Sequence, residues 1–446
     1  MNLAPADLRK EGAGFDLPVA AAVLAASGFI EPQLLRNVMV VGELSLNGEV
    51  RSVSGVLPRV IRARELGCRY CIIPFENLAE GALVKDMKVV GVQNIKEVLK
   101  LVSDPDAFGK ENQFSEVNSE ENQVEESLVD FGEICGQESA RRAAEIAVSG
   151  FHNILFIGPP GTGKTMLAKR IPTIMPSLTF EESLELTKIY SIAGLLSPKR
   201  PLIKARPFRS PHHTSSSAAL AGGGRIPGPG EVTLAHRGVL FLDEMPEFAR
   251  GSLEVLRQPL EDKQIQLSRA SGTYVFPAGF ILVAAMNPCP CGYYPDMNKC
   301  RCTPGEVSHY LHKLSQPLLE RIDLCADVPP VNFSQISEEK PGESSALIRK
   351  RVEKARRIQQ KRYQNEKICF NGELSGKQIR KYCVLTENAF QVAKNAFELM
   401  ELSARSYHRI LKVSRTIADM EGEELIHTRH VAEALTYKAF DKKYRS

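Results

Sequence analysis

A glycine-rich loop between an apolar run and a helix-compatible stretch constrains this chain more than any other feature. The run GPPGTGKT occupies residues 158–165 and directly follows the apolar run 152–157. Backbone N–H groups of such a loop face phosphate oxygens, and the N-terminal end of the following helix adds positive charge. The pattern predicts that a nucleoside triphosphate is bound by Gly158, Pro159, Pro160, Gly161, Thr162, Gly163, Lys164 and Thr165. Within this set, Lys164 can reach the β- and γ-phosphates, and Thr165 can ligate Mg²⁺.

A second acidic motif lies about eighty residues downstream of the loop. The apolar run 238–242 is followed directly by Asp243 and Glu244. Asp243 is placed to hold the Mg²⁺ shell, and Glu244 is the candidate base that polarises an attacking water. The alternative is that both acids cap the start of a helix. Their pairing with the loop favours hydrolysis of the nucleotide.

Three further residues complete a candidate ring-ATPase site. Asn287 follows the apolar run 280–285, where its amide could hold water near the γ-phosphate, and it resembles a sensor-1 residue. Arg321 in LLERIDL is either an arginine finger that serves a neighbouring subunit or a surface ion-pair residue. Arg405 opens an amphipathic helix and resembles sensor 2. The predicted catalytic residues are Glu244, Asn287, Arg321 and Arg405.

The order of these motifs resembles the magnesium-chelatase-like AAA+ family and, within it, the ComM/YifB branch. The match includes GQESARRAAEIAVSG at 136–150, the long run 206–248, and NPCPCG followed by CRC. It extends from Asn2 to about Asp441. The resemblance implies a cytoplasmic ATPase that uses ATP and Mg²⁺ and forms a homo-hexamer on DNA. It further implies helicase or branch-migration activity on single-stranded or branched DNA during natural transformation.

The resemblance also implies the fold class. We expect an α/β AAA+ P-loop core with a helix-2 insert, a pre-sensor-1 hairpin and a C-terminal helical lid. An N-terminal α+β domain like that of the Lon protease precedes the core. The predicted segments are the Lon-like domain at 1–103, an acidic linker at 104–130, the core at 131–335 and the lid at 336–446. The linker is rich in acidic, Asn, Gln and Ser residues, which bury little apolar surface.

The Lon-like segment departs from the protease pattern where the chemistry would occur. Lon-type proteolysis needs a serine nucleophile and an activating lysine. Val19 stands at the position that matches the serine, and Leu57 at the position that matches the lysine. We therefore expect a scaffold or binding domain. Because family members begin upstream of residue 2, we also expect a truncated gene that lacks the opening strands, which would lower this domain's stability.

Two segments are candidates for contact with DNA. Residues 264–276 alternate and turn like a β-hairpin with Arg269 at its tip, similar to the pre-sensor-1 hairpin of MCM-type helicases. The Gly- and Pro-rich segment 210–231 resembles the helix-2 insert. The candidate DNA-binding residues are Arg269, Arg225 and Arg209, and the alternative is that they form local ion pairs. The basic run 348–364 is either a solvated helix or a surface that follows phosphates.

Four of the ten cysteines cluster in two C-x-C pairs, Cys289 with Cys291 and Cys300 with Cys302. Four thiolates in a short loop suit tetrahedral zinc, although C-x-x-C is the more usual spacing. Reduced free thiols and a redox pair are the alternatives. The other six are predicted to be ordinary packing residues: Cys68, Cys71, Cys135, Cys325, Cys369 and Cys383.

Length and charge limit the number of domains and the class of partner, but less sharply than the motifs do. A chain of 446 residues predicts two to four domains, and a net charge of +4 argues neither for nor against nucleic acid. The longest apolar stretch, 18–30, is too short to cross a bilayer, so no membrane partner is expected.

Two other functions remain open. One is a magnesium-chelatase I-type subunit that powers metal insertion into a porphyrin, and the other is a chaperone-like remodeller of proteins.

Overall fold

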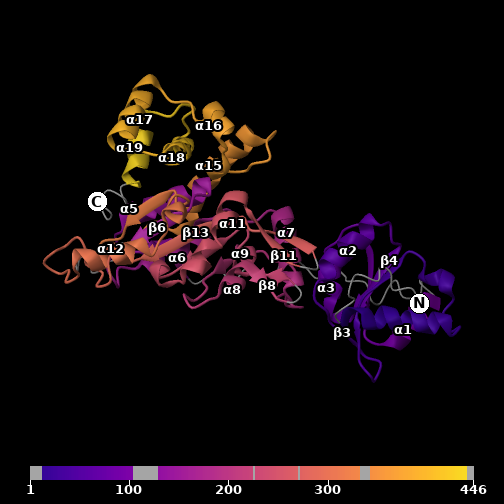
Figure 1. The fold of residues 1–446 in the computed structure, drawn as a ribbon. Helices are drawn as coiled ribbons and strands as arrows, with labels where there is room; N and C mark the ends of the chain where they lie inside the picture. The colour runs from indigo at the N-terminus through magenta and orange to yellow at the C-terminus, as the bar shows by residue number, and fades with distance from the viewer. Residues whose placement is uncertain (1–12, 104–128, 225–226, 270–271, 332–341, 439–446) are drawn as a thin grey trace. The chain divides into compact units, whose positions relative to one another are not determined.

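The computed structural model describes residues 13–103, 129–224, 227–269, 272–331 and 342–438 (Figure 1). Two compact units form: one contains residues 1–124 and 178–204, and the other contains 125–177 and 205–446. Most of the predicted acidic linker, at 104–128, lies outside the described residues, as does Arg225. The predicted boundary at 103 adjoins the undescribed segment 104–128, and the one at 335 falls within the undescribed segment 332–341. Both boundaries stay predictions.

The first unit is built on a parallel three-stranded sheet in the order β1 (Val38–Val40), β4 (Tyr70–Pro74) and β5 (Lys88–Val92). All five residues of β4 are buried, as expected for a central strand covered on both faces. The remaining elements connect and flank these strands: α1 (Asp16–Ala26), β2 (Glu43–Leu44), β3 (Val50–Arg51), α2 (Val56–Glu65), α3 (Leu78–Gly81) and α4 (Ile95–Ser103).

A helix from the middle of the chain, α7 (Phe180–Ile192), belongs to the first unit and packs against α2. The amide of Gly55 donates to the carbonyl of Ser191 over 2.9 Å. The buried carboxylate of Glu80 accepts hydrogen bonds from the Leu57 amide, at 2.8 Å, and from the Ser191 hydroxyl, at 2.5 Å. Leu57, which occupies the position of the protease lysine, is fully buried in the apolar core. This position therefore contributes packing.

The core of the second unit is a five-stranded parallel sheet in the order β14-β6-β13-β10-β7. Every residue of β6, β10 and β13 is buried, so the apolar runs predicted as strands do form strands. The parallel sheet and the helical C-terminal region confirm the predicted fold class. The strands are β6 (Ile154–Ile157), β7 (Phe208–Arg209), β10 (Val239–Leu242), β13 (Ile281–Met286) and β14 (Leu324–Asp327).

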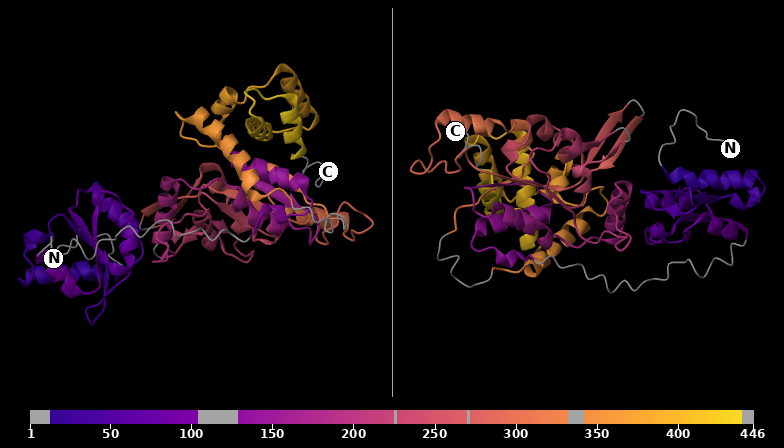
Figure 2. Two further views of the ribbon diagram at one scale, coloured as in Figure 1. Left: turned by 180° about the vertical axis from the view of Figure 1, so that it is seen from behind. Right: turned by 90° about the horizontal axis from the view of Figure 1, so that it is seen from below.

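Helices and short strands surround this sheet, because buried parallel strands need cover on both faces. The helices are α5 (Glu138–Gly150), α6 (Lys164–Ile174), α8 (Ser217–Ala221), α9 (Glu231–Leu234), α10 (Arg250–Glu254), α11 (Arg257–Asp262), α12 (Pro304–His312) and α13 (Gln316–Leu319). The short strands are β8 (Gly222–Gly223) and β9 (Gly228–Pro229), and the longer hairpin is β11 (Gln264–Arg269) with β12 (Gly272–Pro277). Figure 2 shows this hairpin projecting from the core.

Among the described residues, five helices near the C-terminus make up the predicted lid, which gathers at one side of the core in Figure 1. The helix predicted to begin at the sensor-2 arginine is α18, and its apolar side packs on α5, α15 and α19. The lid helices are α15 (Ser345–Tyr363), α16 (Gly376–Tyr382), α17 (Glu387–Leu399), α18 (Ala404–Glu421) and α19 (Thr428–Thr436).

The basic run in the sequence is α15, and several of its arginines bind groups within the protein. Arg351 pairs with Glu145 at 2.6 Å, and Arg349 donates to the carbonyl of Thr173 at 2.9 Å. These contacts use part of the positive charge of α15 inside the protein, whereas Lys350, Lys354, Arg357 and Lys361 are exposed. Contact of this helix with phosphates therefore stays a prediction. Across the described residues, no helix combines the length and the apolar character needed to span a membrane.

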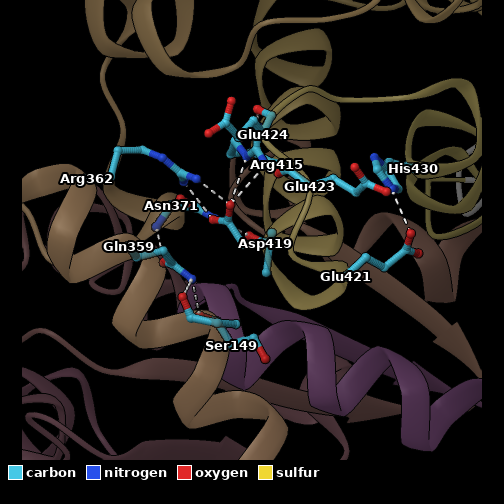
Figure 3. Close-up of polar contacts among 12 residues, drawn as sticks. Ser149, Gln359, Arg362, Asn371, Arg415, Asp419, Glu421, Glu423, Glu424 and His430 are labelled. Carbon is cyan, nitrogen blue, oxygen red and sulfur yellow. Dashed lines mark hydrogen bonds and ion pairs between the residues drawn. The ribbon is translucent and has the colours of Figure 1, made fainter.

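A buried polar network around Asp419 holds the lid together (Figure 3). The carboxylate of Asp419 is fully buried and accepts hydrogen bonds from Arg362, at 2.5 and 2.7 Å, and from Asn371, at 2.8 Å. Arg415, which is also buried, donates to it over 3.1 Å and to the carbonyl of Glu424 over 2.6 Å. One carboxylate thus joins α15, α18 and the turn at Asn371.

We expect Asp419→Ala to lower the free energy of unfolding by about 3–5 kcal/mol, because it leaves the buried guanidinium of Arg415 and the partly buried one of Arg362 without their carboxylate. Thermal and denaturant unfolding of the full chain measure this effect. Glu398→Ala, at an exposed position of α17, is the matched control. A loss below about 1 kcal/mol for Asp419→Ala would mean that the arginines find other partners.

Candidate active site

The glycine-rich loop leaves the carboxyl end of β6 and ends where α6 begins at Lys164. Two of its glycines are required by geometry. A Cβ added at Gly158 would lie 2.1 Å from the carbonyl oxygen of Val328, which no side chain permits. Gly163 has φ +89°, in the left-handed region that favours glycine. The predicted loop context, strand then turn then helix, is therefore present.

Lys164 and Asn287 meet beside this loop. The Lys164 ammonium donates to Asn287 Oδ1 over 3.1 Å and to the carbonyls of Gly158 and Pro159 over 2.8 and 2.7 Å. Burial lowers the pKa of Lys164, while the negative charges of Asp243 and Glu244 oppose that shift. A phosphate could replace the carbonyl partners of this ammonium group. The structure thus brings together the predicted phosphate-binding lysine and the predicted water-positioning amide.

The predicted Mg²⁺ ligands also lie together. The Thr165 hydroxyl donates to Asp243 Oδ2 over 2.8 Å. A hydroxyl and a carboxylate, with phosphate oxygens and water, form the oxygen-rich set that Mg²⁺ prefers. These two residues would hold the ion, and its charge would offset the negative charge of the phosphates.

Glu244 follows Asp243 in an uncommon backbone conformation, with φ 48° and ψ 47°. Its amide donates to the Asp243 carboxylate over 3.0 Å. Its own carboxylate is 62% exposed, and its Oε2 atom lies 3.8 Å from Nδ1 of His213. The turn therefore directs the Asp243 carboxylate toward Thr165 and leaves the Glu244 carboxylate exposed to solvent. A base that activates water needs such access to solvent.

A cleft of about 520 Å³ adjoins this group of side chains. Its lining includes both Glu244 and Asn287, with Pro290 from the cysteine-rich loop and Tyr310 and Lys313 from the α12 region. The candidate base and the candidate water-positioning amide therefore line the same cleft. A water held there could lie between the carboxylate and a bound γ-phosphate.

Arg321 and Arg405 lie together around a carboxylate that the sequence did not single out. The Arg321 guanidinium is 9% exposed and lies 2.5 Å from Glu261 Oε1. The more exposed Arg405 lies 3.5 Å from the same oxygen and 3.8 Å from Glu320. Glu261 has no local sequence signal, because an acid near the end of α11 looks like any surface carboxylate.

The sheet topology separates this arginine pair from the loop of its own chain. Strand β14 begins at Leu324, opposite Ile154 at the amino end of β6, and Arg321 precedes it by three residues. The Arg321 carbonyl accepts from Asn153, just before β6, at 2.8 Å. The glycine-rich loop leaves the other end of β6, about 10 Å away along the strand. The structure does not bring Arg321 and Arg405 to Lys164.

Arg409, one helical turn after Arg405, fixes α18 to the segment that contains Arg321. It donates to the carbonyls of Leu319 and Ile322, at 3.4 and 3.2 Å, and lies 3.6 Å from the Asp323 carboxylate. Burial lowers the pKa of Arg409, and the charge of Asp323 opposes that shift. The sequence analysis did not identify Arg409 as a site residue. Its i, i+4 spacing from Arg405 could have indicated it, because that spacing places both arginines on one face of the helix.

The predicted hairpin and the predicted insert lie next to each other. Arg269 is exposed near the end of β11, and a Cβ added at Gly223 would lie 3.2 Å from its guanidinium. Arg209 instead forms a two-pronged ion pair with Glu231, with both N···O distances 2.7 Å. A DNA phosphate would have to displace that carboxylate, so Arg269 is the better candidate of the two.

The two C-x-C pairs converge in the loop between β13 and α12. The sulfur atoms of Cys289, Cys291, Cys300 and Cys302 all lie within 4.8 Å of one another. Of the six cysteines predicted to be ordinary packing residues, Cys135 and Cys369 are exposed. Both lie in irregular segments outside helices and strands, so for these two the packing prediction is wrong.

Comparison with known proteins extends these observations over nearly the whole chain. Family models described as magnesium chelatase subunit ChlI match residues 130–336, its C-terminal part matches 342–438, and a further ChlI model matches 1–77. The competence protein ComM of Haemophilus influenzae is 43% identical over 443 residues, which is 98% of this chain and 85% of that protein.

Two uncharacterized YifB proteins are similarly close. The protein of Salmonella typhimurium is 41% identical over 445 residues, and that of Escherichia coli is 42% identical over 443 residues. Each match covers 99% of this chain and 85% of the relative. ATP and Mg²⁺ are the cofactors that this family implies, and the Lys164 and Thr165 groups fit them. The chain belongs to the magnesium-chelatase-like AAA+ family, in the branch that contains ComM and YifB.

Proposed function

We propose that this protein is an ATP-hydrolysing ring motor that acts on DNA in the cytoplasm. Its activity would be helicase action or branch migration when incoming single strands recombine during natural transformation. The relative named a competence protein supports this process. The observation that carries the DNA assignment is the exposed arginine of a hairpin that projects from the ATPase core (Figure 2). A cation on such an element can neutralise DNA phosphates.

The placement of Arg321 and Arg405 supports a ring, with a homo-hexamer as the expected assembly. Both arginines lie at the amino end of the sheet, whereas Lys164 and Asp243 lie at the carboxyl end. They would therefore act on a nucleotide held by the next subunit, where a guanidinium can stabilise transition-state charge. Their shared partner Glu261 would hold the pair in place until that subunit docks.

ATP turnover would move the hairpin and the insert along DNA. Lys164 and Asn287 touch each other, and Asn287 directly follows β13, the strand that the hairpin precedes in the chain. When the phosphates bound by Lys164 change, the contact between Lys164 and Asn287 could shift the end of β13. This short route supports coupling between hydrolysis and the DNA-facing hairpin.

We expect Arg269→Ala to weaken DNA binding while basal ATPase activity stays near the wild-type value, because the side chain is not among the residues that meet at Lys164. Its contribution is phosphate neutralisation, so log affinity falls with log salt concentration. On single-stranded DNA the slope should become shallower by about 0.7 per lost contact in each engaged subunit. Fluorescence anisotropy with labelled single-stranded DNA over a salt series measures the slope.

Arg62→Ala is the matched control, since Arg62 is an exposed arginine of the first unit that pairs with Glu65. An unchanged salt slope in Arg269→Ala would remove the hairpin from the DNA path. Absence of any DNA binding by the assembled, nucleotide-loaded wild type would contradict the motor proposal. Metal insertion into a porphyrin or protein remodelling would then be the better account.

A further inference from the structure

The loop between β13 and α12 brings four sulfur atoms to the spacing of a metal centre. Cys289 Sγ lies 3.4 Å from Cys291 Sγ and 3.8 Å from Cys300 Sγ, and the last two atoms are 3.6 Å apart. The Cys302 sulfur completes the group within 4.8 Å of the others. A tetrahedral zinc site with Zn–S bonds of about 2.3 Å has sulfur–sulfur edges of about 3.8 Å. We propose that these cysteines bind one structural Zn²⁺ ion.

The spacing argues against a redox disulfide as the resting arrangement. A disulfide would bring one sulfur pair to about 2 Å and leave the other two cysteines apart from it. Here three sulfur atoms are mutually within 3.8 Å, and all four cysteines are unbridged. A soft, four-sulfur tetrahedral set suits zinc or an iron–sulfur cluster. The short sulfur–sulfur edges fit a single central ion.

Backbone groups around the cluster support thiolate ligands. The amides of Gly292 and Tyr294 point at Cys289 Sγ, at 3.2 and 3.4 Å. Such N–H···S contacts orient a ligating sulfur and offset part of its negative charge. Cys289 is fully buried and Cys300 nearly so, which shields the centre from solvent.

The loop has no regular secondary structure to fix its shape. Residues 287–303 contain turns and no helix or strand, and the backbone hydrogen bonds that connect them are local, such as the one from Gly292 to Cys289. Zinc binding supplies folding free energy to segments that bury too little apolar surface to order themselves. The ion would therefore fix this loop to the end of β13.

The proposed zinc loop lies against the nucleotide site at two places. Cys289 is only two residues after Asn287, and Pro290 lines the same cleft as Glu244 and Asn287. A Cβ added at Gly292 would lie 2.5 Å from Cδ of Pro160, so the loop packs directly on the phosphate-binding turn. The ion thus positions Asn287 and the phosphate-binding turn without taking part in hydrolysis.

Metal content of the wild-type chain, purified without chelators, tests the site and requires neither ATPase activity nor DNA. We expect about one zinc per chain by elemental analysis and four thiols protected from a thiol reagent in the folded protein. Replacement by Co²⁺ should give the absorption of a tetrahedral thiolate site. Absence of zinc with all four thiols reactive, or iron in place of zinc, would overturn the proposal.

Substitution separates the four ligands from the other cysteines. Cys302→Ser should lose most of the bound zinc, whereas Cys369→Ser, at an exposed cysteine outside the cluster, should retain it. Circular dichroism checks that Cys302→Ser remains folded. Full zinc retention in folded Cys302→Ser would show that this cysteine is not a ligand and contradict the four-cysteine site.

Zinc removal from the wild type by a chelator tests the positioning role. We expect kcat for ATP to fall by about 10–100-fold, with a smaller change in KM, and to recover when Zn²⁺ is restored. Magnesium is kept in excess throughout, so that the chelator does not act on the catalytic ion. An unchanged kcat in protein that has lost its zinc would contradict the positioning role and leave the site itself standing.

Discussion

We expect Lys164→Ala to abolish ATP binding, whereas Glu244→Gln retains ATP binding and loses hydrolysis by about 10²–10⁴-fold. The lysine is the buried cation of the glycine-rich loop, within 3.1 Å of Asn287, so its loss would remove the predicted ground-state contacts with phosphate. The glutamate is an exposed carboxylate whose loss removes water activation alone. Nucleotide affinity by calorimetry and steady-state turnover separate the two effects.

Lys169→Ala provides the matched control for the first variant, since Lys169 is exposed on the same helix, α6. It should bind and hydrolyse ATP as the wild type does. Equal ATP affinity in Lys164→Ala and the wild type would remove the glycine-rich loop from nucleotide binding. Wild-type turnover in Glu244→Gln would move the general base to another residue.

Arg321→Ala is expected to lose about 10³-fold or more in turnover, as arginine fingers do. If Arg321 serves the neighbouring subunit, mixing this variant with Glu244→Gln restores part of the activity. Some interfaces then pair an intact Glu244 in one subunit with an intact Arg321 in the next. The measurement is ATPase activity over a range of mixing ratios at constant total protein.

Arg321 also pairs with Glu261 inside its own chain, so loss of folding must be separated from loss of catalysis. Thermal unfolding of Arg321→Ala serves that purpose, and Arg62→Ala is an arginine control outside the ATPase unit. No recovery in well-mixed rings of folded subunits would argue against a shared site.

Local sequence patterns predicted the parts of the molecule that depend on local physics. The strands β6, β10 and β13 are continuous apolar runs because both faces of each are buried. The hairpin β11–β12 follows from alternation around a turn, and α18 from apolar residues at helical spacing after Ser403. The contact between Lys164 and Asn287 could also be predicted, because residues that directly follow parallel strands lie at the same edge of the sheet.

Contacts between distant segments could not be predicted in this way. Nothing in the sequence of α7 indicates that it packs with the first unit, because that choice depends on how Ser191 meets Gly55 and Glu80 across the fold. The same holds for Glu261, which contacts both Arg321 and Arg405. Such partners are ordinary surface residues by composition, and only the three-dimensional arrangement distinguishes them. The catalytic, DNA-binding and zinc roles stay predictions for experiment.

The central claim is that DNA is the substrate that this ATPase moves. Steady-state ATP hydrolysis by the full chain, measured alone and with branched DNA, single-stranded DNA, unfolded protein or a porphyrin-loaded partner, tests it most directly. Our account predicts that branched or single-stranded DNA raises the rate. A rate of ATP hydrolysis that does not change with DNA and rises with unfolded protein or the porphyrin-loaded partner would contradict the claim that DNA is the substrate.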